Sequence, residues 1–168
     1  MEITLRRAAA DEGPAIGSLH VRGWRWAYPG VVPDEVLATL PEQRYIDYWS
    51  RMASELPGEH RLWVADGGGR IVGFAHTAPS DDAEAATGTG EVTAIYLERE
   101  WAGAGVGRAL FAHAVNDLRR RGFSVATLWV FRDNARARRF YTIAGWREDG
   151  GEKLERGAVQ VRYRVEFA

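Results

Sequence analysis

A glycine-rich turn between a strand and an amphipathic helix constrains this chain more than any other feature. The segment Ala102-Gly103-Ala104-Gly105-Val106-Gly107-Arg108 follows a predicted strand over 91–97 and opens a helix whose apolar residues recur at helical spacing. Small residues keep side chains out of the turn, so backbone N–H groups can converge on an anion, and the helix N-terminus adds about half a positive charge. The turn predicts a phosphate or pyrophosphate site, although the same glycines also suit a tight turn without a ligand.

Two other phosphate-binding motifs do not match this turn. A Walker A loop ends in Gly-Lys-Ser/Thr, whereas Gly107 is followed by Arg108 and Ala109. A dinucleotide fingerprint needs Gly-x-Gly-x-x-Gly near the first strand of several βαβ units, and here the spacing is different and the turn comes late. A nucleotide-dependent oxidoreductase is therefore disfavoured.

The segments around the turn predict the fold class. Strands over 61–66 and 70–78 flank three glycines, which is typical of an antiparallel hairpin, and the nearly continuous apolar run 123–131 is typical of a strand buried on both faces. Residues 159–167 alternate as a strand with one wet face. Helical segments are expected over 11–27 with Asp11 as N-cap, over 33–40, after Pro41, from the glycine turn to Gly122, and over 134–144. We expect residues 1–168 to form a single domain of the α/β (α+β) class. Its mixed, mostly antiparallel sheet has one parallel β-α-β crossover and helices on both faces.

Composition excludes several classes of protein. The chain has 22 basic and 23 acidic side chains, and this near-neutral balance argues against a nucleic-acid binder. No stretch without a charged side chain is longer than the ten residues of the run 122–131, about half of a membrane span, and the N-terminus has no apolar signal segment, so no membrane association is expected. Cysteine is absent, which fits a cytoplasmic protein. The four histidines show no metal-ligand spacing, so we expect no metal.

Two motifs together resemble the GNAT superfamily of N-acetyltransferases. The segment 102–107 matches the Gln/Arg-x-x-Gly-x-Gly/Ala loop of that family except at Ala102, where the family has Gln or Arg. Residues 134–146 are similar to its Asn-x-x-Ala-x-x-Phe-Tyr-x-x-x-Gly-Phe stretch, with Trp146 in place of the usual Phe. One predicted strand separates the motifs, as in the family, and residues 20–30 resemble the opening of a common bacterial subgroup.

The resemblance implies a GNAT-like fold, acetyl-CoA as co-substrate, and an acetyl group moved to a small-molecule or peptide amine. Its cofactor site would comprise the main chain at Ile95 and Leu97, the turn residues Ala102, Gly103, Ala104, Gly105, Val106 and Gly107, and the side chains of Arg108 and Asn134. Ile95 and Leu97 are equally core residues of a central strand, and Asn134 is equally a helix N-cap.

The resemblance also suggests two catalytic residues. Tyr141 is the candidate general acid, since a phenol with a pKa near 10 can protonate a departing thiolate; alternatively, it only packs on its helix face. Glu91 is the candidate general base, directly or through water, or else an exposed carboxylate at a strand end. Without cysteine or a serine nucleophile motif, direct transfer in a ternary complex is favoured over an acyl-enzyme.

Acceptor specificity is expected in the first helices and in the loops before Glu91. Trp24, Trp26, Tyr28 and Trp129 are the candidate acceptor-binding residues, although aromatic clusters are more often core or dimer contacts. The final alternating strand offers either a homodimer contact or a solvent-exposed face. An acyl-CoA-binding regulatory module without turnover is the alternative function, because Ala102 departs from the family motif and the base is uncertain.

Overall fold

The computed structural model describes residues 2–168 and arranges them around a seven-stranded sheet in the order β1-β2-β3-β4-β5-β7-β6. β4 and β5 pair in parallel, and the other neighbours pair antiparallel. The strands are Ile3–Arg7 (β1), Arg61–Gly67 (β2), Ile71–Pro79 (β3), Thr89–Leu97 (β4), Val125–Phe131 (β5), Arg147–Glu155 (β6) and Ala158–Glu166 (β7). The helices are Gly13–Ala27 (α1), Asp34–Ala38 (α2), Glu42–Ser54 (α3), Val106–Arg120 (α4) and Ala135–Ile143 (α5), with a 3-10 turn at Arg99–Trp101 (η1). The expected mixed, mostly antiparallel sheet with one parallel crossover is confirmed.

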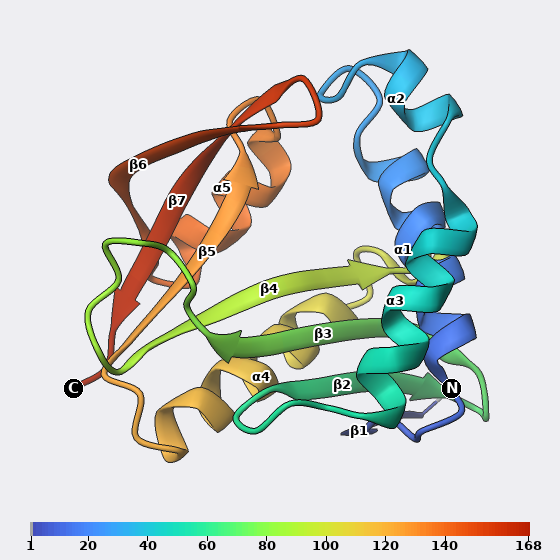
Figure 1. Cartoon of the computed structure of the whole chain (residues 1–168), viewed down its shortest axis with the longest axis horizontal. Helices are drawn as coiled ribbons and strands as arrows, with labels where there is room; N and C mark the ends of the chain where they lie inside the picture. Colours follow the sequence, from blue (N-terminus) through green and yellow to red (C-terminus); the bar gives the residue numbers. More distant parts are fainter. Residues whose placement is uncertain (1) are drawn as a thin grey trace.

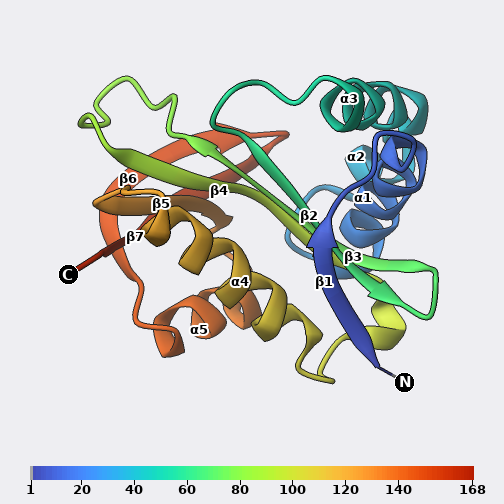
Figure 2. The same cartoon turned by 90° about the horizontal axis from the view of Figure 1, so that it is seen from below.

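Helices cover both faces of the sheet, with α1, α2 and α3 on one side and α4 and α5 on the other (Figure 2). Ile16 of α1 and Trp49 of α3 pack with Phe74 of β3 in one apolar cluster, whereas Leu110 of α4 packs in a second cluster on the opposite face. α1 and α3 approach closely, because a Cβ at Gly17 would lie 2.5 Å from the Cα of Ile46. Glycine is therefore the residue that permits this contact.

The first helix begins later than the sequence suggested. α1 starts at Gly13, and Glu12 rather than Asp11 occupies the N-cap position without capping through its side chain. The Glu12 carboxylate instead accepts hydrogen bonds from the Arg6 guanidinium and from the Ala9 N–H. This pairing joins α1 to β1 and moves the helix start two residues along the chain.

The sheet splits between its two parallel strands. β4 and β5 pair only where Thr89–Glu91 meet Val125–Thr127. Beyond that point β4 continues beside β3 and β5 beside β7, so the two strands diverge (Figure 1). Thr93 has no partner in β3, since Val92 pairs with Thr77 and Ala94 with His76, and such a bulge bends a strand. The bulge lies where β4 leaves β5.

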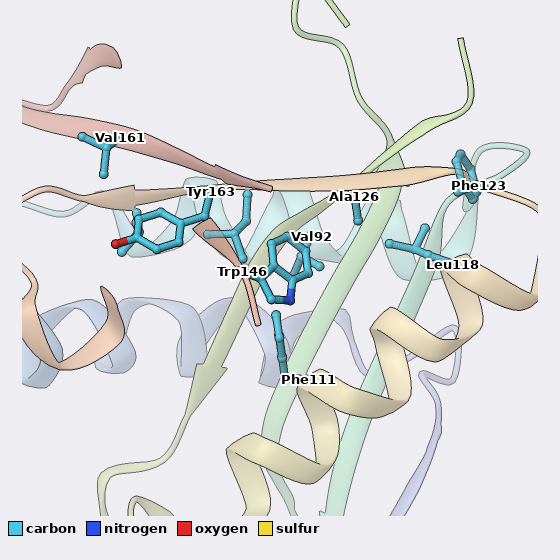
Figure 3. Packing of buried hydrophobic residues seen from close by; sticks show 10 residues of the cluster. Val92, Phe111, Leu118, Phe123, Ala126, Trp146, Val161 and Tyr163 are labelled. Atoms are coloured by element: carbon cyan, nitrogen blue, oxygen red, sulfur yellow. The ribbon is translucent and has the colours of Figure 1, made fainter. Parts of the chain in front are cut away.

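An apolar cluster fills the closed end of this split on the side of α4 and α5 (Figure 3). Its buried members come from different parts of the chain: Val92 of β4, Phe111 of α4, Trp146 just before β6, and Tyr163 of β7. Trp146, which stands where the family motif has Phe, is 3% exposed. The cluster holds the two halves of the sheet together where they still pair.

The final strand lies inside the sheet, between β5 and β6. Both of its edges are paired, so the strand cannot pair across a homodimer in the way the sequence suggested. Its alternation is confirmed at the centre, where Val161 and Tyr163 are buried and their neighbours are partly exposed. Within residues 2–168, no helix is both long and apolar enough to cross a membrane.

Candidate active site

A continuous cleft of about 1500 Å³ follows the gap between β4 and β5. The cleft joins the glycine turn before α4 to a chamber formed by α1, β4, β5 and the β6–β7 hairpin. Most of the predicted site residues line it: Glu91, Tyr141, Ile95, Leu97, Ala102, Gly103, Gly105, Gly107, Arg108, Asn134, Trp24, Trp26, Tyr28 and Trp129. Ala104 and Val106 are not among the lining residues, and the Val106 side chain is buried in the core beneath α4.

The glycine turn presents unpaired N–H groups to this cleft. Gly105 is the N-cap of α4 and has a φ of 87°, a left-handed conformation in which a side chain is strained. The N–H of Ala109 bonds to the carbonyl of Gly105 at 3.1 Å, so the N–H groups of the three residues between them precede the helical ladder. A Cβ at Gly103 or Gly105 would meet no atom within 4 Å. The turn therefore leaves open space where the helix dipole favours an anion.

The free edge of β4 adds main-chain groups along the middle of the cleft. The N–H of Glu98 points to β3, where it bonds to the carbonyl of Val72 at 2.8 Å. Because N–H and C=O groups alternate in direction along a strand, those of Ile95 and Leu97 point away from β3, toward the gap. The carbonyl of Leu97 indeed accepts a 3.0 Å hydrogen bond from the indole of Trp26. The contact of these main-chain groups with a cofactor stays a prediction.

Helix α5 places two predicted residues on the opposite wall. The Asn134 side chain accepts a 3.1 Å hydrogen bond from the N–H of Ala137 and caps the helix. Tyr141 packs against Phe111, and its burial raises the pKa of the phenol, so the hydroxyl stays protonated at neutral pH. Within residues 2–168, no hydrogen bond contributes to the pKa of Tyr141. Its proton is not committed to another protein group.

The aromatic residues at the end of α1 divide into two groups. Trp24 and Tyr28 lie on one face of the helix, and both donate hydrogen bonds to the hydroxyl of Tyr96, at 2.9 and 3.2 Å. Trp26 points elsewhere, to Leu97, with the Arg136 guanidinium 5.9 Å from its ring. Residues two apart on a helix do not share a face, so the three do not form one wall. Only Trp24 and Tyr28 belong to the chamber near Tyr96.

Glu91 lies at the point where β4 and β5 separate. Burial raises the pKa of its carboxyl to about 7, and the nearby Asp82 and Asp81 add to the effect. Ser80 donates a long hydrogen bond, 3.4 Å, to the carboxylate. A carboxyl with a pKa near neutrality can both accept and release a proton at physiological pH. The side chain is half-buried in the cleft and is not the fully exposed strand end considered from the sequence.

An ion-pair network surrounds Trp129 next to Glu91. The indole donates to Asp82 at 3.2 Å, and the Lys153 ammonium lies 4.4 Å from the ring centroid. Asp81, Asp82 and Glu91 place oxygen atoms within 4.8 Å of one another. Asp82 already accepts hydrogen bonds from Trp129 and Arg162, so the network itself accounts for that carboxylate. The absence of a metal stays a prediction from the histidine spacing.

Several cleft residues escaped the sequence analysis. His20 lines the chamber, accepts a 2.9 Å hydrogen bond from Trp49, and has its pKa lowered to about 3 by burial. Tyr45 lines the same chamber from α3. Arg156 reaches it from the β6–β7 hairpin. Tyr45 and Arg156 belong to no local motif, and the three residues come from three different elements, so their grouping depends on tertiary structure.

The cleft has the arrangement of an enzyme that moves a group between two substrates, since a turn with unpaired N–H groups lies at one end and a titratable carboxyl beside aromatic rings at the other. The model of the Acetyltransferase (GNAT) family matches residues 20–146. The chain therefore belongs to the GNAT family, and it is an N-acetyltransferase.

Individual relatives and structures agree with this assignment. The chain is 34% identical over 133 residues to the uncharacterized N-acetyltransferase YuaI of Bacillus subtilis, a match covering 79% of this chain and 73% of YuaI. The PaiA N-acetyltransferase of Thermoplasma acidophilum, solved in complex with coenzyme A, superposes with a TM-score of 0.78 at 17% identity, covering 99% of this chain and 100% of that one. YncA of Salmonella typhimurium, solved with acetyl-CoA, gives 0.73 at 17% identity, covering 99% and 94%. At these identities, the two structures confirm the fold.

Proposed function

We propose that this protein transfers an acetyl group from acetyl-CoA directly to the amine of a small molecule or peptide, within a ternary complex. The observation that carries the proposal is the continuous cleft through the β4–β5 gap, with the glycine turn at one end and Glu91 at the other. The coenzyme A in the PaiA structure and the acetyl-CoA in the YncA structure support the choice of acyl donor.

The residues at the glycine turn fit the diphosphate of such a donor. The turn offers unpaired N–H groups and space beside Gly103 and Gly105, and the Arg108 side chain is exposed at the cleft. Acetyl-CoA supplies the thioester. Ile95 and Leu97 would hydrogen-bond the amides of its pantetheine arm through their main chain, and Asn134 would add a side-chain contact.

Three groups of this chain would assist the chemistry. Glu91 removes a proton from the acceptor ammonium or amine, directly or through water. The main-chain N–H of Leu97 stabilises negative charge that develops on the thioester oxygen. Tyr141 donates its proton to the departing thiolate. Burial raises the pKa of Tyr141, and it would raise the pKa of a thiolate in the same cleft as well.

Thr93, which lines the cleft, forms with the buried His76 a hydroxyl–imidazole pair of the kind that a covalent route would need. The Thr93 hydroxyl lies 2.5 Å from Nδ1 of His76, whose Nε2 lies 3.1 Å from Nδ1 of His60. Burial lowers the pKa of His76 to about 3, which makes it a poor base at neutral pH. Direct transfer is therefore favoured over an acetylated Thr93.

Four measurements test the proposal together. Calorimetric titration should show acetyl-CoA binding, and an amine panel should release free thiol from acetyl-CoA. With a responding amine, initial rates at varied concentrations of both substrates should give intersecting double-reciprocal lines, and intact mass should show no acetylated protein. Binding without transfer to any amine would contradict the function. Parallel lines, or protein carrying one acetyl group, would contradict direct transfer.

A further inference from the structure

The tip of the β6–β7 hairpin carries an arginine in an unfavourable backbone conformation. Glu155 pairs with Ala158, so Arg156 and Gly157 form a two-residue turn, and both have positive φ, 47° and 80°. Such a turn favours Asn or Gly at its first position, because a Cβ is strained there. Within residues 2–168, Arg156 is the only residue other than glycine with positive φ. Backbone strain of this kind is concentrated at functional sites, which points to a functional role for the Arg156 side chain.

The hairpin tip is fixed against the opposite wall of the cleft. A Cβ at Gly157 would lie 3.2 Å from Cγ of Pro33, the residue before α2. Ala158 packs against an apolar cluster that includes Val32 and Phe131. In Figure 1 the β6–β7 tip accordingly lies next to the segment leading into α2. The hairpin therefore holds the Arg156 side chain at the acceptor end.

The Arg156 guanidinium lies above the aromatic chamber. Its central carbon is 5.8 Å from the ring centroid of Tyr45 and 5.9 Å from that of Trp24. Both rings line the cleft together with His20. The nearest carboxylate is that of Glu155, with Oε1 3.8 Å from Nε of Arg156, which is longer than a hydrogen bond. Neither terminal nitrogen of Arg156 has a hydrogen-bond partner among residues 2–168, so both can make a bidentate contact with an anion.

A second arginine on the same hairpin shows the contrast. Arg162 is 12% exposed and does not line the cleft, and two of its guanidinium nitrogens donate to carboxylates. Its hydrogen-bond partners are Asp82, Glu84 and Asp149. Lys153, one strand away, lies over Trp129 and lowers the pKa of Glu91 through its charge. The chamber thus combines two carboxyls, those of Glu91 and Glu155, with two cations, Lys153 and Arg156, that make no hydrogen bond within residues 2–168.

We propose that Arg156 binds the carboxylate of the acceptor, so that the enzyme acetylates small amines that also carry a carboxylate, amino acids foremost. This inference rests on the proposed function and narrows its acceptor. The amine end lies toward Glu91, the carboxylate meets the Arg156 guanidinium, and the side chain packs on the rings of Trp24 and Tyr45. A diamine of the same length would bring a second cation toward Arg156.

Matched pairs of amines test this proposal in binding and in turnover. The probes are L-phenylalanine and L-leucine with their amides, and β-alanine and γ-aminobutyrate for longer spacing between amine and carboxylate. At least one acid should raise the melting temperature of the coenzyme A-loaded protein, and it should be acetylated with a KM at least tenfold below that of its amide. The difference between an acid and its amide should appear in KM far more than in kcat, as expected when the carboxylate contributes to binding.

Two variants separate recognition from folding. Arg156→Asn should raise KM for the preferred acid at least tenfold while keeping or raising the melting temperature, because Asn suits the turn. Arg147→Gln on β6, whose guanidinium pairs with Glu166 at the surface, should leave KM unchanged.

Three outcomes would overturn the inference: amides bound as well as acids, Arg156→Asn keeping the preference for acids, or no acid stabilising the loaded protein. Binding of acetyl-CoA and thiol release with other amines would survive each of them. A failure of this inference is therefore distinguishable from a failure of the proposed function.

Discussion

The two ends of the cleft are built from different parts of the chain. The glycine-turn end is mostly main chain: N–H groups of one turn and the edge of one strand, within a single continuous segment, 95–108. The chamber end is made of side chains from α1, α3, β4, β5 and the β6–β7 hairpin. A main-chain site can keep its geometry through many substitutions, whereas a side-chain site changes with each one. The difference suggests that the donor site is the constant part of the molecule and the chamber the part that sets specificity.

The largest effect is expected where the two ends meet, at Tyr141. Tyr141→Phe should lower kcat by about 10²–10⁴-fold, the usual contribution of a positioned acid. Its unfolding free energy should change by less than about 0.5 kcal/mol, because no hydrogen bond of the protein is lost. Steady-state rates with a responding amine and thermal unfolding are the measurements.

Tyr163→Phe is the matched control for this variant. The buried hydroxyl of Tyr163 accepts a 3.1 Å hydrogen bond from Arg138, so its removal should cost about 1 kcal/mol of stability and leave kcat unchanged. Equal loss of kcat in both variants would show that Tyr141 acts only through packing.

The next effect concerns Glu91 and pH. Burial raises the carboxyl pKa from 4.5 to about 7, so the charged form is disfavoured in the folded protein. The resulting loss of unfolding free energy is absent below pH 4.5, grows between pH 4.5 and 7, and is constant above pH 7. Glu91→Gln should therefore gain up to about 3 kcal/mol of unfolding free energy at pH 8 and nothing at pH 4. The same variant should remove a limb near pH 7 from the kcat/KM profile and leave the limb caused by the acceptor amine.

Denaturant unfolding across this pH range checks the sign. Glu84, whose pKa is lowered by Arg162, provides the opposite case, since Glu84→Gln should not stabilise the protein at pH 8. If Glu91→Gln behaved like Glu84→Gln and kept the limb near pH 7, Glu91 would not be the base.

The smallest effect separates backbone strain from ligand binding at the donor end. Gly105 and Gly122 have similar φ, 87° and 93°, and a Cβ at either would meet no atom within 4 Å. Gly105→Ala and Gly122→Ala should both cost about 1 kcal/mol of stability. Only Gly105→Ala should weaken the binding of acetyl-CoA, by about tenfold in Kd, which corresponds to about 1.4 kcal/mol. Titration calorimetry measures the affinity of both variants for acetyl-CoA. Equal affinities would mean that the glycine turn does not bind this ligand.

The contrast between the two ends also explains what the sequence revealed. The sheet, the crossover and the glycine turn follow from local patterns: alternation, helical spacing and positive-φ glycines. The ion pairs of Arg162 and the position of Arg156 depend on how β7 pairs beside β5 and β6 pairs beside β7. No local sequence pattern predicts that pairing. Trp26 is a second example. The sequence grouped it with Trp24 and Tyr28 as an acceptor-binding residue, but its indole donates to the carbonyl of Leu97 instead. Asp11 failed as an N-cap because Arg6, on another element, fixes the neighbouring Glu12.

A crystal structure with coenzyme A tests the central claim most directly. The account predicts the diphosphate within hydrogen-bond distance of the N–H groups of Gly105, Val106 and Gly107, the thiol end in the β4–β5 gap, and the chamber beside Glu91 left open. Density for the diphosphate at another place on the molecule, with the glycine turn empty at saturating ligand, would contradict it.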